Sequence, residues 1–85
     1  MKHATAMALD RLEPLLVKLR RHIELKEKSR GVFYFKSRAV LHFHEDPKGL
    51  FADFRAREGW QHCAVNTAKE QAILLQAVDA FLSTA

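Results

Sequence analysis

The spacing of apolar residues changes at Gly31, and this change constrains the fold class more than any other feature of the sequence. Before Gly31, apolar residues recur three and four positions apart, as on one face of a helix: Leu9, Leu12, Leu16, Leu19 and Ile23. After it the period becomes two, in the short runs "VFYFK", "AVLHFHE" and "LFADFRA", which are rich in aromatic and β-branched residues. The sequence therefore predicts a helix followed by short antiparallel strands.

The boundaries of the first helix follow from its proline and its glycine. Pro14 is best tolerated in a first helical turn, so we expect the helix to begin near residue 10, with Asp10 as the N-cap. The apolar stripe thins out in "ELKEKSRG", and Gly31 is a typical helix stop. We therefore expect a helix over about residues 10–28, with 3–9 as a frayed or separate turn.

The remaining elements are predicted from turn residues and from one capping pattern. Strands are expected at about 32–36, 39–45 and 50–56, with a candidate fourth at 60–65, and "DPKG" places Asp, Pro and Gly where a type I turn favours them. Thr67 and Glu70 fit a capping box that begins a helix over 67–83. The predicted fold is a single two-layer α+β domain over 1–85, with an N-terminal helix, a meander of three to four strands and a C-terminal helix.

Size and cysteine content exclude several classes of protein. A chain of 85 residues builds one core, and it contains no apolar run long enough to span a bilayer and no signal-peptide pattern. The single cysteine, Cys63, excludes an intramolecular disulfide and a zinc site of several cysteines. It most often packs as a small apolar group facing the core. We expect a cytoplasmic domain without a cofactor.

The charge of the chain is uneven, which suggests a basic binding surface. Residues 1–38 hold ten Lys/Arg against four Asp/Glu (+6), whereas residues 39–85 hold four against six (−2). A basic face suits an anionic partner such as nucleic acid or an acidic protein, although a solvated helix exterior has the same composition. The candidate anion-binding residues are Arg20, Arg21, Lys26, Lys28, Arg30, Lys36 and Arg38.

Two histidines in the second strand raise the question of a site. His42 and His44 share one face of a strand because they are two residues apart. A two-residue turn sets His42 opposite Asp53, whereas a three-residue loop with a bulge sets it opposite Phe54. We adopt the first register, because it gathers four apolar side chains on the core face: Leu41, Phe43, Ala52 and Phe54.

This register permits three functions for the outer face of the sheet. His42, His44 and Asp53 form a weak candidate metal site, with His62 available from the next strand. Acid–base catalysis is disfavoured, because no nucleophile, phosphate loop or dinucleotide motif accompanies the histidines, and we expect no enzyme. Exposed aromatic residues on this face would suit stacking on a base, a protein partner or a homodimer.

The aromatic residues have structural interpretations as well. Phe33, Phe35 and Phe51 either line the outer face or pack beneath a helix, and Trp60 is expected to close one edge of the core. The leading hypothesis is a non-enzymatic module that binds an anionic partner through the basic surface. A homodimerisation or protein-interaction domain and a histidine metal site remain the alternatives.

The segment "FYFKSRAVLHFHEDPKGLFADFR" also resembles the strand and hairpin core of a group of short uncharacterised bacterial proteins. In that group an F-Y-x-K-S-R-A segment leads into L-H-F-H-E-D-P-x-G and an A-D strand. The resemblance covers about the middle third of the chain. It implies a compact bacterial cytoplasmic domain, and it assigns no catalytic or binding residue.

Overall fold

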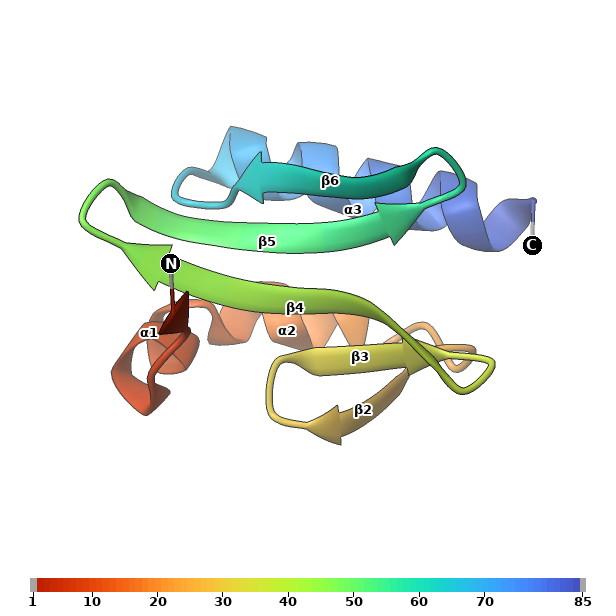
Figure 1. Cartoon of the computed structure of the whole chain (residues 1–85), viewed down its shortest axis with the longest axis horizontal. Helices are drawn as coiled ribbons and strands as arrows, with labels where there is room; N and C mark the ends of the chain where they lie inside the picture. The colour runs from red at the N-terminus through yellow and green to blue at the C-terminus, as the bar shows by residue number, and fades with distance from the viewer. Residues whose placement is uncertain (1, 85) are drawn as a thin grey trace.

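The computed structural model describes residues 2–84, which form a six-stranded antiparallel sheet and three helices. Along the chain these elements are β1 (Lys2–His3), α1 (Ala6–Arg11), α2 (Glu13–Leu19), β2 (Lys26–Ser29), β3 (Val32–Phe35), β4 (Arg38–Asp46), β5 (Gly49–Ala56), β6 (Gly59–Ala64) and α3 (Ala68–Ser83), as Figure 1 shows. The strands follow the order β2-β3-β4-β5-β6, and β1 pairs with β4.

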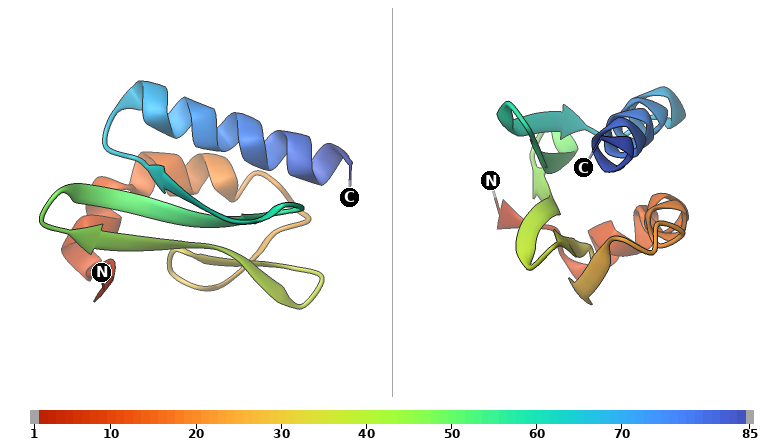
Figure 2. Two further views of the ribbon diagram at one scale, coloured as in Figure 1. Left: turned by 45° about the horizontal axis from the view of Figure 1, so that its top comes forward. Right: turned by 90° about the vertical axis from the view of Figure 1, so that its right-hand side faces the viewer.

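The sheet and the helices form two layers. Figure 2 shows α2 and α3 on one face of the sheet, and no helix of residues 2–84 covers the other face. The predicted α+β class, with an antiparallel sheet and helices at both ends, is confirmed. The predicted number of strands is wrong, because the sheet has six strands instead of three or four. Within the described range, no helix combines the length and apolar character needed to cross a membrane.

The N-terminal part of the chain differs most from the prediction. Pro14 does lie in the first turn of a helix, α2, but the residues before it are helical too and form α1. Pro14 cannot donate a backbone hydrogen bond to the preceding turn, so the two helices remain separate. The N-cap of α1 is Thr5, whose hydroxyl accepts from the backbone N–H of Ala8 at 3.3 Å, and the expected role of Asp10 as N-cap is wrong.

The expected end of the first helix near residue 28 is also wrong, since α2 ends at Leu19. The apolar stripe stops there, and Ile23 is 94% exposed. Residues 26–29 instead become the edge strand β2, joined to β3 by a turn in which Gly31 has φ of +80°. Glu27 holds this turn by accepting a hydrogen bond from the N–H of Gly31 at 2.9 Å. A polar segment thus pairs as a strand because the turn of its hairpin is held in place.

The register adopted for the central hairpin is confirmed. His42 pairs with Asp53 and His44 with Phe51, and Asp46 pairs with Gly49 across a two-residue turn. Asp46 accepts from the N–H of Lys48 at 2.7 Å, as expected for a turn residue. The sheet therefore turns four side chains of this hairpin into the core, each at most 2% exposed: Leu41, Phe43, Ala52 and Phe54.

The core lies between the sheet and the helices. It joins Ala8 of α1 and leucines in and just before α2 to strand residues and to Leu74 and Val78 of α3. Phe33 is buried in it and Phe35 packs against it, which confirms the interpretation that these rings lie beneath a helix. Cys63 also packs against the core, and burial raises the pKa of its thiol.

The capping box predicted for the last helix is present. The hydroxyl of Thr67 accepts from the N–H of Glu70 at 3.1 Å, and the carboxylate of Glu70 accepts from the N–H of Thr67 at 3.0 Å. Both bonds satisfy donors that a helix end leaves unpaired. Asn66, just before the cap, exchanges two hydrogen bonds with the backbone of Leu50 and fixes the start of α3 on β5.

We expect the substitution Thr67→Ala to lower the free energy of unfolding by about 1 kcal/mol, because it removes one side of the capping box. Urea denaturation followed by circular dichroism measures the change. Ser83→Ala, at the exposed other end of α3, is the control and should leave the midpoint unchanged. Equal midpoints for the two variants would show that the cap does not stabilise the chain.

Candidate functional site

A cleft opens where β4 and β5 separate. The two strands pair from Asp46 and Gly49 up to Leu41 and Phe54. Beyond that point the first residues of β4 pair only with β3, and the last residues of β5 pair only with β6. A register shift in the β3–β4 ladder places Val40 as an extra residue, so that Val40 and Leu41 are both buried. A bulge of this kind bends a strand, and here it turns β4 away from β5.

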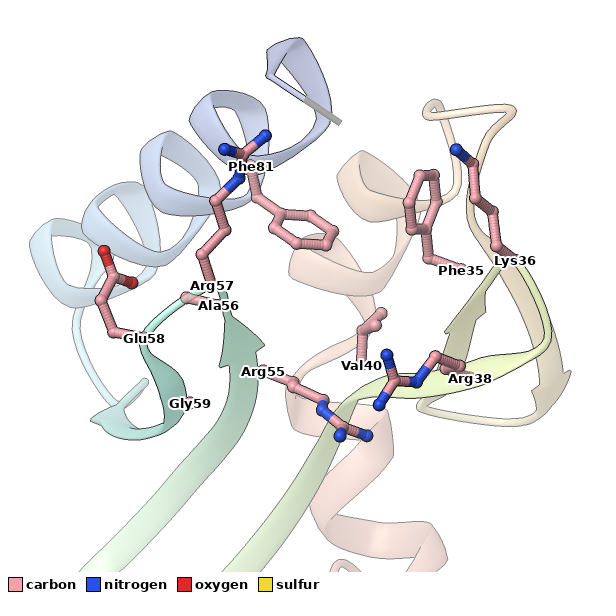
Figure 3. Close-up of a pocket in the computed structure, with 10 residues that line it drawn as sticks. All are labelled: Phe35, Lys36, Arg38, Val40, Arg55, Ala56, Arg57, Glu58, Gly59 and Phe81. Carbon is pink, nitrogen blue, oxygen red and sulfur yellow. The ribbon is translucent and has the colours of Figure 1, made fainter.

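The cleft has apolar walls and a volume of about 510 Å³. Phe81 of α3 lies beneath it, with its ring centroid 5.4 Å from that of Phe35 and 5.6 Å from that of Phe54, both edge to face. Small-molecule sites in proteins have volumes of about 300–1,000 Å³. The lining residues, labelled in Figure 3, are Phe35, Lys36, Arg38, Val40, Arg55, Ala56, Arg57, Glu58, Gly59 and Phe81.

Four cations surround this opening, and we call Lys36, Arg38, Arg55 and Arg57 the cleft cations. Figure 3 shows Arg38 and Arg55 reaching from their two strands toward the same opening. None of the four forms an ion pair within residues 2–84. Arg57 donates to the backbone carbonyl of Thr84, and Lys36 lies 5.2 Å from the centroid of the Phe35 ring. Four cationic side chains therefore line a cleft with apolar walls, and within the described range 2–84 the only carboxylate among the lining residues is that of Glu58.

The turn that carries one of these cations is strained. Lys36 and Ser37 form a two-residue turn between β3 and β4, and their φ angles are +50° and +70°. Such angles are typical of a type I′ hairpin turn, which usually contains Asn and Gly. Strain of this kind is found preferentially at binding and catalytic sites. The turn presents Lys36 and Arg38 on either side of the exposed Ser37.

Two members of the predicted basic surface are neutralised. Arg20 pairs with Glu13 and Glu27 at 2.5 Å each, and Arg30 pairs with Asp10 and Glu13 at 2.8 and 2.9 Å. Hydrogen bonds to Glu27 and Glu13 raise the pKa of Arg20, and those to Glu13 and Asp10 raise the pKa of Arg30. This network fastens the first helices to the β2–β3 hairpin.

The other predicted basic residues lie in two places. Arg21, Lys26 and Lys28 are exposed on the loop after α2 and on the edge strand β2, and Lys28 lies 5.3 Å from the centroid of the Tyr34 ring. Lysines on an edge strand discourage pairing with a second sheet, so β2 is a poor surface for the predicted homodimer. Lys36 and Arg38 alone reach the cleft.

The histidines of β4 do lie on the open face of the sheet, as predicted. Asp53 lies between two histidines, with Oδ2 2.8 Å from Nε2 of His44 and Oδ1 2.6 Å from Nδ1 of His62. His42 contacts Trp60 with 5.1 Å between ring centroids. The expectation that Trp60 closes the core is wrong, because β6 turns it to this face, where it is 49% exposed.

Sequence reasoning missed His3, Arg55 and Arg57 as site residues. The signal for the two arginines was their alternation around Ala56 at the end of a predicted strand. No local pattern, however, indicates which strand end lies beside the "KSR" turn. His3 reaches the open face because β1 pairs it with His44, and a two-residue strand has no detectable period.

No protein-family model, curated protein or solved structure matches this chain. The functional assignment therefore depends on the geometry of the cleft and of the histidine face.

Proposed function

We propose that this chain is a non-enzymatic binding module for a phosphate-bearing ligand, which it holds in the cleft between β4 and β5. The observation that carries the proposal is that the four cleft cations line one cavity with apolar walls and that none of them is ion-paired within residues 2–84. Bringing like charges together costs free energy, and an anion bound between them offsets that cost.

The residue types favour phosphate over other anions. Three of the four cleft cations are arginines, whose planar guanidinium groups match phosphate oxygens with paired hydrogen bonds. The edge-to-face rings of Phe35 and Phe81 add an apolar surface on which a planar group can pack. A nucleotide, free or within a strand, combines both features.

The same residues argue for binding instead of catalysis. The ten residues around the cleft include no histidine, cysteine or serine, and Glu58 is the one acid among them. Such a set can neutralise and orient a phosphate but offers neither a nucleophile nor a histidine base. The proposed partner surface is therefore narrower than the basic face expected from the sequence, because Arg20 and Arg30 are used in ion pairs.

Titration of the full chain with ATP, tripolyphosphate and a short single-stranded oligonucleotide tests the proposal. Trp60, the single tryptophan, reports on binding because its ring lies 5.7 Å from the guanidinium carbon of Arg55. We expect saturable binding that weakens as salt rises, with ATP binding more tightly than tripolyphosphate because of its base.

The oligonucleotide identifies the source of the phosphate. An affinity well above that of ATP would indicate nucleic acid, and a similar or lower affinity would indicate a free nucleotide. The absence of saturable binding of all three probes at low salt would contradict the proposal.

A further inference from the structure

We propose a second site, on the open face of the sheet, in which His3, His42 and His44 bind a divalent transition-metal ion. One nitrogen of each histidine lies within 4.8 Å of the corresponding nitrogens of the other two. The three rings come from two strands, since His3 of β1 pairs with His44 of β4, and His42 lies two residues from His44 on the same face. None of the three histidines lines the phosphate cleft.

Buried ring nitrogens without partners are the second observation. Nδ1 of His42 and both ring nitrogens of His44 are inaccessible to solvent and make no hydrogen bond within residues 2–84. A buried polar atom without a partner costs free energy, and native structures usually satisfy such atoms. A metal ion would satisfy Nδ1 of His42 and one nitrogen of His44, because an imidazole nitrogen binds it through its lone pair.

Asp53 determines which nitrogen of His44 is available. Nε2 of His44 lies 2.8 Å from Oδ2 of Asp53, an ion-pair distance, although the geometry is not that of a hydrogen bond. We infer that Nε2 carries the ring proton toward this carboxylate, which leaves Nδ1 of His44 to bind the metal ion. Carboxylates commonly orient metal-binding histidines in this way. Asp53 is therefore a positioning residue here, and His3 takes the ligand position that the sequence had suggested for Asp53.

The environment of His42 disfavours the protonated form of its ring. Burial lowers the pKa of His42, and the neighbouring His44 and His3 lower it further, while Asp53 acts in the opposite direction. A neutral imidazole retains the lone pair that a metal ion needs.

The spacing requires a small closure of the site. Around a tetrahedral zinc ion with Zn–N bonds of about 2.0–2.1 Å, neighbouring nitrogens lie about 3.3 Å apart. The present separations, up to 4.8 Å, therefore need to shrink by at most about 1.5 Å. His3 is exposed and lies on a two-residue strand, so it has room to make this approach. Three imidazoles and a water molecule then complete a set suited to zinc, copper or nickel.

The test is calorimetric titration of the untagged full chain with zinc chloride, with circular dichroism as a check of folding. We expect one zinc ion per chain, and quenching of Trp60 fluorescence by nickel, because the Trp60 ring contacts His42. His3 is exposed, so we expect the variant His3→Gln to fold like the unmodified chain. We expect this variant to bind zinc at least tenfold more weakly. The reason is that even removal of an orienting partner costs about 10–100-fold.

Two further variants complete the test. Asp53→Asn is expected to weaken binding by about 10–100-fold while leaving one zinc ion per chain, as expected for a positioning residue. His22→Gln is the matched control, because His22 pairs with Asp79 at 2.8 Å and is not part of the cluster. The inference is overturned if the unmodified chain binds no stoichiometric zinc, or if His3→Gln and His22→Gln bind zinc equally well.

Discussion

Replacing Arg38 and Arg55 together by glutamine is expected to weaken the binding of tripolyphosphate and ATP about 100-fold. Each guanidinium supplies charge-assisted hydrogen bonds to phosphate, and one such bond contributes about 1.5–3 kcal/mol. The cleft is open to solvent, so we take the lower end of that range for each residue, and a 100-fold loss corresponds to about 2.7 kcal/mol. Isothermal titration calorimetry at fixed ionic strength measures the change.

The control for this variant has the same net charge. Lys48→Gln with Lys69→Gln also removes two positive charges, from the β4–β5 turn and from the first turn of α3. Both positions lie at the opposite end of the molecule from the cleft (Figure 1). We expect this control to change the affinity by less than threefold, which is the size of a screened long-range effect. If both double variants lose affinity equally, the ligand responds to net charge and the cleft is not its site.

The parts of the fold that could be predicted are those specified by residues close together in the sequence. The β4–β5 hairpin was predicted with its register because apolar residues alternate along both strands, and slipping by one residue would turn Phe43 away from the core. The last helix was predicted because Thr67 and Glu70 lie three residues apart, and the side chain of each accepts a hydrogen bond from the backbone N–H of the other. In both cases one local pattern favours the structure that is observed.

In the N-terminal third a helix was predicted, but its boundaries and the strands β1 and β2 were not, because these depend on distant contacts. The segment Lys26–Ser29 has helix-forming residues and no alternation, yet it is a strand. Two contacts of Glu27, to Arg20 and to the N–H of Gly31, hold the hairpin in place. Close packing reinforces it, since a side-chain carbon at Gly31 would lie 2.7 Å from Cδ2 of Leu9. Tertiary contacts of this kind override helix propensity.

The two candidate sites were predictable only in part, for the same reason. Sequence alternation placed His42 and His44 on one face, and it correctly set Asp53 opposite His42. The cleft, in contrast, exists because β4 bends at Val40 and leaves β5, and no residue pattern at Val40 marks this bulge. Counting charges identified the basic residues, but it could not show that Arg30 is ion-paired and Arg38 is not. Ion pairing depends on which acidic residues the fold places beside each arginine.

The largest change in stability is expected from Phe54→Ala. Phe54 is 1% exposed, and its ring supports Phe81 beneath the cleft. Removing a buried aromatic ring costs about 3–5 kcal/mol through lost burial and the cavity that remains. A chain of 85 residues has a total stability of only about 4–13 kcal/mol. We therefore expect a loss of at least about 12 °C in melting temperature, measured by circular dichroism.

The control for Phe54→Ala is Ile73→Ala, which removes a large apolar side chain from α3 where it is 55% exposed. We expect a change within about 0.5 kcal/mol for this variant, because little apolar surface there leaves water on folding. Both substitutions delete several carbon atoms, so a difference in stability between the two variants reports mainly on the burial of the side chain. A loss below about 1 kcal/mol for Phe54→Ala would mean that the aromatic ring is not packed as described. Phe81 would then have to be supported beneath the cleft by residues other than Phe54.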